Sequence, residues 1–408
     1  MLSDAQRASL LELTGLPTAA GREDAVHAFL DRWLAERPDL TSRADAHGNR
    51  EISFSQGTGR PLSVDPPIYF TAHLDHPAFV VDRVVAPTVL ECAFRGGVMD
   101  DYFENAAVEL CRGDARIPGV VTGRGDTEAP DKSWIVELDE EGDPEPGDIV
   151  RWRFEPAEIV EQDLPIGERG EMLWTNACDD LAAAWCALEA MDRLRERRSR
   201  GEPVGDARLL FTVAEEVGFI GAIGASRDAF IEKGARVIAL ETSRSFADSP
   251  IGGGPIVRVG DRLSIFTPQL TAAVAKAAEN LAGAPATPKA TEKRESGPRW
   301  RWQRKLMAGG ACEASVFCAY GYDATCVCLP LGNYHNMADL DALQAKTNTS
   351  PPRPGREHIA VADAEGLIDL LEACAVDLPP VARPVSRFEK LFDERRAVLG
   401  PRTETGVG

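Results

Sequence analysis

The chain has 408 residues, of which 44% are hydrophobic and 27% are charged, a composition typical of a soluble globular protein with room for more than one domain. Its 45 Lys and Arg residues are outnumbered by 65 Asp and Glu residues, and the net charge of −20 argues against nucleic acid or an anionic membrane as the main partner. No apolar run approaches the length of about 18 residues that a membrane span needs, and the N-terminus does not read as a signal peptide, so we expect a cytoplasmic protein.

The first half of the chain predicts an α/β domain interrupted by a β-rich insertion. Residues 22–38 have the apolar spacing of a helix, and residues 67–76 contain the short apolar run of a central parallel strand. Between residues 78 and 173, short β-like runs alternate with Gly, Pro and acidic turns. This texture indicates a small inserted β-domain.

The α/β pattern resumes after the insertion. Residues 179–200 predict an amphipathic helix whose basic C-terminal end suits the helix dipole. Further elements are expected as strands at 207–214, 235–241 and 323–331, helices at 266–282 and 363–375, a polar loop at 284–298 and a surface excursion at 346–358. We therefore predict an α/β fold with a mixed, mostly parallel central sheet flanked by helices, with one domain at 1–77 and 174–408 and the inserted β-domain at 78–173.

The nine cysteines do not form a pattern of disulfides or a zinc motif. Their number is odd, most lie in apolar runs, and no C-x-x-C pair occurs, so reduced thiols in the core of a cytoplasmic protein are expected. Zinc bound by Cys326 and Cys328 is the alternative. Alternate residues of one strand explain that spacing equally well.

Several predicted strands run into histidine or carboxylate side chains just past their C-terminal ends. In open α/β sheets, sites form beyond the carboxyl ends of the strands, so these side chains should meet at one edge of the sheet. Histidine and carboxylate together are the ligands of zinc, cobalt or manganese sites. The candidates are His73, Asp75, Glu215, Glu216, Glu241 and His335, joined by Asp179 at the start of the amphipathic helix.

Two pairs among these candidates indicate a division of roles. In His73-x-Asp75, a carboxylate could accept the second N–H of a metal-bound imidazole; an ordinary turn is the alternative. Glu215 and Glu216 follow a buried strand, and Gly218 eases a turn that lets both reach one site. One could bind metal while the other takes a proton from a bound water; an exposed acidic turn is the alternative.

The remaining candidates each have a simpler explanation as well. Asp179 and Asp180 could be an acidic helix start, Glu241 could bond to a loop, and His335 could be an ordinary loop histidine. His27 and His358 stand in helix-like or loop contexts without acidic company, and His47 is expected to be a turn residue. His76 stays open because it adjoins His73.

The motifs taken together resemble the tetrahedral aminopeptidases, a family of glutamyl- and leucyl-type di-metal peptidases, over most of the chain and in the same order. "TAHLDHPAF" resembles the family's AHMDE element, "NACDD" its DD element, and "TVAEEVGFIGA" and "IGGGPIVRVGD" its EE-VG and G-GP elements. "MAGGACEA" and "LGNYHN" resemble its GGTDA and YIH elements. The EEVG and GGGP matches are the most specific.

This resemblance implies a zinc-exopeptidase-like fold and two divalent ions per chain, zinc foremost and cobalt or manganese as alternatives. Glu216 and His335 would share one ion, His73 and Glu241 the other, and Asp179 would touch both. Asp75 would orient His73, and Glu215 would be the general base for a water held between the ions, in an aminopeptidase that removes N-terminal residues from peptides. The insertion falls where the family has its dimerisation domain, so a homo-oligomer, a dimer or a dodecamer, is expected.

Several departures from the family pattern cluster on the substrate side. His76 replaces an acidic residue, Glu241 and Glu313 each replace Asp, an arginine is missing after "NACDD", and "NYHNM" replaces "YIHSP". None removes a predicted ligand. A hydrolase of N-acyl-amino acids or other small amides therefore stays open as an alternative, and so does a non-catalytic binding or scaffold protein, although the retained ligands and Glu215 argue against the latter.

Overall fold

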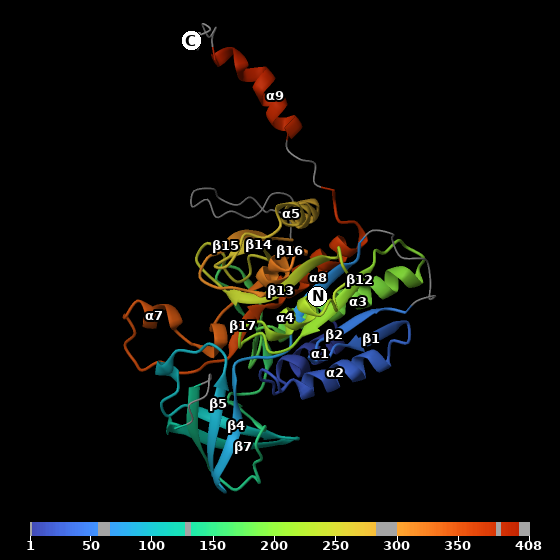
Figure 1. The fold of residues 1–408 in the computed structure, drawn as a ribbon. Helices are drawn as coiled ribbons and strands as arrows, with labels where there is room; N and C mark the ends of the chain where they lie inside the picture. The colour runs from blue at the N-terminus through green and yellow to red at the C-terminus, as the bar shows by residue number, and fades with distance from the viewer. Residues whose placement is uncertain (1, 56–65, 127–131, 283–299, 381–384, 400–408) are drawn as a thin grey trace, which may run out of the picture.

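The structure, a computed structural model, describes residues 2–55, 66–126, 132–282, 300–380 and 385–399 (Figure 1). The polar loop predicted at 284–298 lies outside the described residues. The central element of the structure is an eight-stranded sheet in the order β1-β2-β12-β3-β13-β16-β14-β15. The strands are β1 (Leu40–Ala44), β2 (Arg50–Phe54), β3 (Ile68–His73), β12 (Ala207–Thr212), β13 (Arg236–Arg244), β14 (Ile256–Asp261), β15 (Gln303–Met307) and β16 (Asp323–Leu331).

The middle of this sheet is parallel and its flanks are mixed. β12, β3, β13 and β16 run parallel to one another, whereas β2 pairs with β12 and β14 pairs with β16 in antiparallel fashion. Every residue of β3 is buried, because helices cover both faces of the sheet. The strand predicted at residues 67–76 is thus β3, at the centre of the sheet.

Helices pack on the two faces of the sheet. On one face, α1, α3, α5 and α8 contribute to a core with alternate strand residues such as Phe70 and Leu209, and α4 and α6 cover the opposite face around Tyr69 and Leu210. The helices are α1 (Asp4–Thr14), α2 (Asp24–Ala35), α3 (Leu181–Ser199), α4 (Ile220–Arg227), α5 (Pro268–Ala282), α6 (Glu313–Ala319), α7 (Leu340–Gln344), α8 (Val361–Val376) and α9 (Val385–Arg395), with short 3-10 turns η1 (Asp100–Tyr102), η2 (Tyr334–Asn336) and η3 (Arg396–Leu399).

The region between β3 and α3 contains a closed six-stranded barrel. Its strands are β4 (Ala78–Ala86), β5 (Val89–Arg95), β6 (Ala107–Arg112), β7 (Ala115–Arg124), β8 (Lys132–Leu138) and β9 (Ile149–Trp152). Aromatic rings fill its interior, and Phe103 stacks on Trp134 with ring centroids 4.0 Å apart. The barrel hangs below the main body in Figure 1.

Two strands beyond the barrel pair with the C-terminal part of the chain. β10 (Glu158–Asp163), β11 (Arg169–Thr175) and β17 (Glu357–Ala360) form a separate antiparallel sheet in that order. The insertion predicted at 78–173 therefore covers the barrel and also β10 and most of β11. Because these two strands form a sheet with β17, to which β11 is paired, and not with the barrel, we propose that the inserted domain ends at Trp152. The predicted surface excursion at 346–358 also ends too late, since its last two residues belong to β17.

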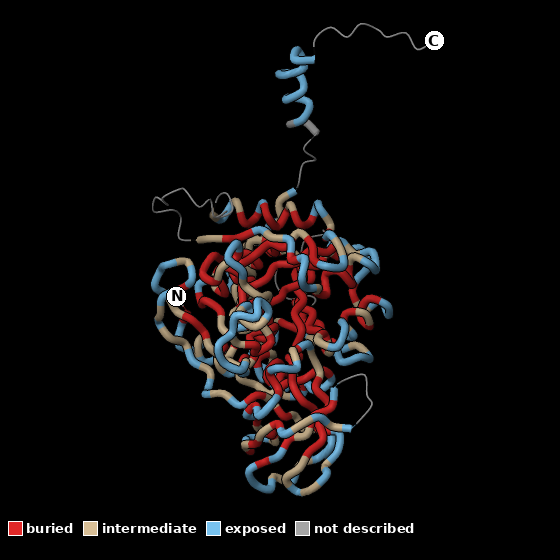
Figure 2. Tube along the Cα trace, turned by 90° about the vertical axis from the view of Figure 1, so that its left-hand side faces the viewer, coloured by how far each residue is buried: buried red, intermediate tan, exposed pale blue. Residues whose placement is uncertain are grey.

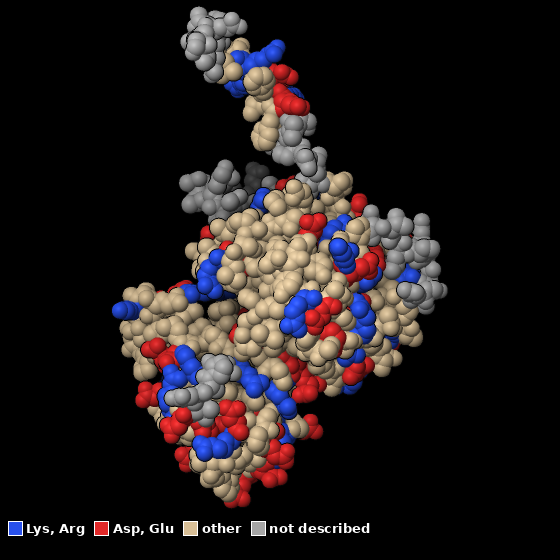
Figure 3. Space-filling view, in the orientation of Figure 1, with Lys and Arg blue, Asp and Glu red and all other residues tan. Residues whose placement is uncertain are grey.

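Burial follows this architecture (Figure 2). Buried residues fill the sheet and its helices, whereas residues 388–399 of α9 and η3 are exposed and stand away from the body. All nine cysteines are free, as expected, and eight of them are buried. None of the described helices is long and apolar enough to cross a membrane. On the face shown in Figure 3, the described acidic and basic side chains are interspersed.

His358→Phe is expected to make the protein more resistant to acid. The His358 ring stacks on Trp174 with centroids 4.0 Å apart, and burial lowers the pKa of His358 from 6.5 to about 4. Between pH 6.5 and pH 4 the unfolded chain binds a proton at His358 that the folded chain does not bind. Acidification from pH 7 to 4.5 therefore lowers the free energy of unfolding by about 2–3 kcal/mol through this residue. Urea unfolding at both pH values should show a smaller loss in the variant; equal losses would exclude His358 as the cause.

Candidate metal centre

The predicted site residues meet at the C-terminal edge of the parallel strands. Thr212, the last residue of β12, lies opposite His73 in register, and β13 lies on the other side of β3, so the ends of these strands are neighbours. The residues are placed as follows: His73 at the end of β3, Asp75 just beyond it, Asp179 before α3, Glu215 and Glu216 after β12, Glu241 on β13 and His335 on η2.

The Asp179 carboxylate lies between the two imidazoles. Its Oδ1 is 3.3 Å from His73 Nε2 and its Oδ2 is 3.4 Å from His335 Nε2. Asp179 is 2% exposed, and both histidines are buried as well. One carboxylate therefore faces two separate nitrogen ligands, as a residue that bridges two metal ions must.

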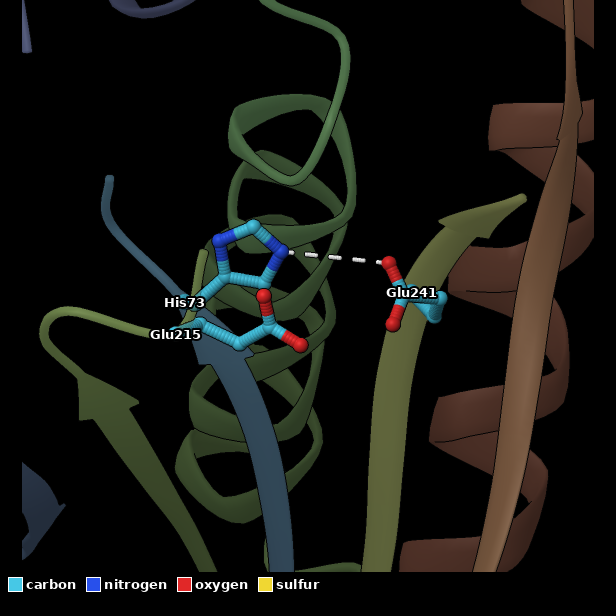
Figure 4. Close-up of side chains that lie close together, drawn as sticks. All are labelled: His73, Glu215 and Glu241. Carbon is cyan, nitrogen blue, oxygen red and sulfur yellow. Dashed lines mark ion pairs between the residues drawn. The ribbon is translucent and has the colours of Figure 1, made fainter. Parts of the chain in front are cut away.

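A further carboxylate stands beside each imidazole. Glu216 Oε1 lies 3.2 Å from His335 Nε2, and Glu241 Oε1 lies 3.8 Å from His73 Nε2. Figure 4 shows the latter pair together with Glu215, whose carboxylate lies beside the His73 ring. Three groups of residues could each hold a metal ion, because within each group the candidate ligand atoms lie within 4.8 Å of one another. The groups are His73, Glu215 and Glu241; His73, Asp179 and Glu216; and Asp179, Asp180 and Glu241.

The donor set fits divalent metal. Three buried carboxylate oxygens in this cluster, Asp179 Oδ1, Asp180 Oδ2 and Glu216 Oε1, have no hydrogen-bond donor, and a buried anion without a partner is costly unless a cation balances it. Imidazole nitrogens and carboxylate oxygens are the ligands that zinc and related ions prefer. Among the described residues, no group of this kind includes Cys326 or Cys328.

Charge crowding shifts the pKa values of the site in opposite directions. Burial raises the pKa of Glu215 well above its usual range, and burial with the nearby Asp179 charge raises the pKa of Glu241 to about 7. Burial alone would lower the pKa of His73, but Glu215 and Asp179 raise it well above its usual value. Burial opposes ionisation of Asp179 too, but the two imidazoles lower the pKa of Asp179. Protons thus occupy positions that a cation would take.

The orientation of both histidines leaves the same ring nitrogen for metal. His73 Nδ1 lies 3.0 Å from the backbone carbonyl oxygen of Asp75, and His335 Nδ1 lies 2.8 Å from the carbonyl oxygen of Gly97. An N–H donated to a carbonyl fixes the tautomer of a neutral imidazole, so Nε2 is the nitrogen that a metal would bind once its proton is lost. Gly97 belongs to the connection between β5 and η1, so the barrel region helps to orient His335.

The Asp75 carboxylate lies near the His73 ring and also contacts a part of the site that the sequence did not indicate. Its Oδ1 is 3.6 Å from His73 Nδ1, whereas its two oxygens accept hydrogen bonds from the backbone N–H groups of Glu215 (2.9 Å) and Glu216 (3.0 Å). Asp75 therefore meets the His73 ring through its carbonyl oxygen. Its carboxylate fixes the glutamate pair.

The glutamate pair lies in a tight turn after β12. Ala214 has φ 53° and Gly218 has φ 112°, both in the left-handed region, and the Glu215 carbonyl accepts hydrogen bonds from the N–H groups of Gly218 and Phe219. The predicted turn at Gly218 is present, and it sets two adjacent side chains at the same edge of the sheet.

Two residues at this site were missed or left open by sequence reasoning. His76, the departure from the family's acidic residue, donates from Nδ1 to the Asp179 carbonyl (2.5 Å), and its Nε2 lies 3.0 Å from Asn336 Oδ1. Glu357 accepts hydrogen bonds from the N–H groups of Asp179 and His335. Its position after a polar, proline-rich segment gives no local signal of this role.

Known proteins place this geometry in context. The family model of the M42 glutamyl aminopeptidases matches residues 60–286. Similar solved structures include a TET1 peptidase of Pyrococcus horikoshii that can assemble into a tetrahedron or a large octahedral shell (19% identity, TM-score 0.66, 91% of this chain and 100% of that one). An aminopeptidase of the archaeon Desulfurococcus kamchatkensis is 18% identical, with a TM-score of 0.66 over 91% of this chain and 95% of that one.

A protein of Thermotoga maritima described as an endoglucanase is 17% identical, with a TM-score of 0.58 over 90% of this chain and 96% of that one. At these identities the structural matches establish the fold, and they confirm the predicted mixed α/β architecture. No curated protein matches the sequence.

Proposed function

The chain belongs to the M42 glutamyl aminopeptidase family and is therefore a metal-dependent peptidase, and from this premise we propose that it removes N-terminal residues from peptides with two divalent ions and Glu215 as general base. The observation that carries the proposal is the position of Asp179, which lies within 3.4 Å of both His73 Nε2 and His335 Nε2. Zinc is the foremost candidate for both ions, with cobalt and manganese as alternatives.

The residues divide into two groups of ligands. Glu216 and His335 would hold one ion and His73 and Glu241 the other, with Asp179 shared. When bound, two such ions would polarise the scissile carbonyl and lower the pKa of a water molecule, so that it can lose a proton and attack at neutral pH. The carbonyl oxygens of Asp75 and Gly97 orient the rings of His73 and His335. The carboxylates of Asp75 and Glu357 accept hydrogen bonds from the backbone N–H groups of Glu216, Asp179 and His335.

Glu215 is the residue placed to move the proton. It is 8% exposed, and its carboxylate lies beside the His73 ring but is left out of the ligand set proposed above. Burial raises the pKa of Glu215, which suits a base that keeps a proton long enough to deliver it. It takes one proton from the attacking water, whose oxygen bonds to the carbonyl carbon, and gives that proton to the leaving amine as the C–N bond breaks.

The substrate would be a peptide with a free α-amine, which the carboxylates of this acidic site can bind. We also propose that the chain acts as a homo-oligomer, because its family relative TET1 of Pyrococcus horikoshii assembles into large shells. The barrel, inserted beside the site, is the candidate dimerisation domain.

A panel of dipeptides and their N-acetylated forms tests the substrate class. With zinc or cobalt added, the free-amine dipeptides should be hydrolysed, and acetylation should lower kcat/KM by at least about a hundredfold, because it removes one buried ionic contact. Preference for the acetylated forms would favour an N-acyl-amino-acid hydrolase instead. No turnover of either set by metal-loaded protein would favour a binding or scaffold role.

A further inference from the structure

Glu357 joins the backbones of two predicted metal ligands that are far apart in the chain. It is the first residue of β17 and is fully buried. Its Oε2 accepts hydrogen bonds from the N–H groups of Cys178 (2.7 Å) and Asp179 (3.0 Å), and its Oε1 accepts one from the N–H of His335 (2.8 Å). A single carboxylate thus spans the two segments.

Pairing with neighbouring strands brings this carboxylate to the His335 turn. The chain leaves the site after His335, runs through α7 and returns, and isolated bridges join Met337 to Pro354 and Gly332 to His358. β17 also pairs with β11, which leads directly to the segment of Asp179. Glu357 therefore sits where the β11 and η2 segments converge.

The His335 turn needs an external acceptor to keep its shape. Asn333, His335 and Asn336 have φ values of 55°, 54° and 61°, a left-handed conformation that costs free energy in residues with a side chain and persists when surrounding contacts impose it. The N–H of His335 donates its hydrogen bond to the side chain of Glu357. Loss of this acceptor would leave a buried N–H unpaired and release the turn.

Asp75 and Glu357 use the same device on different ligands. Asp75 holds the N–H groups of Glu215 and Glu216, and Glu357 holds those of Asp179 and His335. The ligands Glu216, Asp179 and His335 are thus all fixed through their backbones. We propose that Glu357 is a positioning residue that sets the separation of Asp179 and His335, and thereby the affinity of the ion that these two share with Glu216. This inference rests on the proposed function, because it takes its two metal positions as given.

Glu357→Gln in the full chain tests this role through metal binding. Gln offers one acceptor oxygen and turns an N–H₂ group toward donors, so one of the two backbone segments loses its partner. Metal-depleted protein titrated with Co²⁺, followed by visible absorption and calorimetry, should bind two ions in the wild type. In the variant, the ion at His335 and Glu216 should bind about 10–100 times more weakly. The ion at His73 and Glu241 should lose less affinity, because it shares Asp179 but does not use His335.

Asp363→Asn is the matched control. Asp363 is also a buried carboxylate that accepts two backbone N–H groups, those of Gly252 and Gly254, both at 2.7 Å. It lies on α8, three residues after β17 ends, and its two backbone donors do not belong to predicted ligands. This variant should lower the thermal unfolding temperature of the metal-free protein but leave both Co²⁺ affinities unchanged.

The outcomes separate this inference from the proposed function. If wild-type protein binds no Co²⁺, the di-metal function fails first. If wild type binds two ions and Glu357→Gln binds both with wild-type affinity, Glu357 has no positioning role. The same conclusion follows if Asp363→Asn weakens the binding of one ion as strongly as Glu357→Gln does. Should Glu357→Gln fail to fold, Glu357→Asp keeps the charge and shortens its reach, and unchanged Co²⁺ affinities there would overturn the inference.

Discussion

Glu215→Gln is expected to lower kcat by about 10²–10⁴-fold while the protein still binds two divalent ions. The substitution keeps the shape of the side chain but removes the group that takes the proton from water. The backbone of Glu215 is held by Asp75 and by the turn at Gly218, so the fold of the site should survive. Burial disfavours the Glu215 carboxylate, and a neutral amide relieves that cost, so stability should not fall.

Glu216→Gln is the control for this experiment, because the two residues are neighbours with different predicted tasks. Glu216 Oε1 lies 3.2 Å from His335 Nε2 and has no hydrogen-bond donor, so its substitution should weaken metal binding as well as turnover. Steady-state kinetics at saturating metal, with metal content measured on the same samples, distinguishes the two. If Glu215→Gln retained full kcat, or lost its metal as Glu216→Gln does, Glu215 would not be the base.

That several candidate ligands would lie close together could be predicted, because it follows from the positions of strand ends. His73, Glu216 and Glu241 each lie at or near the C-terminal end of a buried apolar run, and parallel strands bring such ends to one edge. Imidazole and carboxylate are typical metal ligands, so these residues could be identified as candidates without knowledge of the distances between them. The same reasoning predicted the parallel strands β3, β12, β13 and β16, because their burial on both faces leaves nearly continuous apolar sequence.

The contacts that hold the ligands could not be predicted, because they depend on tertiary pairing. Asp75 was expected to act on the His73 ring, but nothing in the sequence indicated that its carboxylate also accepts hydrogen bonds from the turn of Glu215 and Glu216. Glu357 meets His335 because β17 pairs with β11. The orientation of His335 likewise depends on Gly97 of the barrel region. In each case a polar side chain forms a hydrogen bond with a backbone group of a distant segment. The sequence around the side chain does not indicate which segment that is.

The boundary of the inserted domain illustrates the same limit. β10 and β11 have the short, polar texture of the barrel strands, so the sequence extended the insertion to residue 173. β11 pairs with β17, which lies far later in the chain, and β10 joins this sheet through β11. Strand pattern predicts that a segment is β, but its neighbour in the sheet is decided by packing.

Removal of the metal is expected to reverse the pH dependence of stability. In metal-free protein the pKa values of His73, His335 and Glu241 are all raised relative to their unfolded values, that of Glu241 from 4.5 to about 7. The folded chain then binds more protons than the unfolded chain, so stability falls as pH rises, between 4.5 and 7 for Glu241 and from 6.5 upward for the histidines. Asp179, whose pKa is lowered, contributes in the opposite direction only below about pH 4.

Bound metal requires the deprotonated ligands, so its contribution grows as pH rises. At free metal about a thousandfold above the dissociation constant it stabilises the fold by about 4 kcal/mol, and that excess is reached more easily at pH 8 than at pH 5. The difference in Tm between zinc-loaded and chelator-treated protein should therefore widen steadily from pH 5 to pH 8. His358 affects both forms equally and cancels in this difference, whereas Asp179→Asn, which weakens the shared ligand, should narrow it at every pH. A difference that stays constant or shrinks with rising pH would show that the imidazoles and carboxylates at this edge of the sheet do not bind the metal.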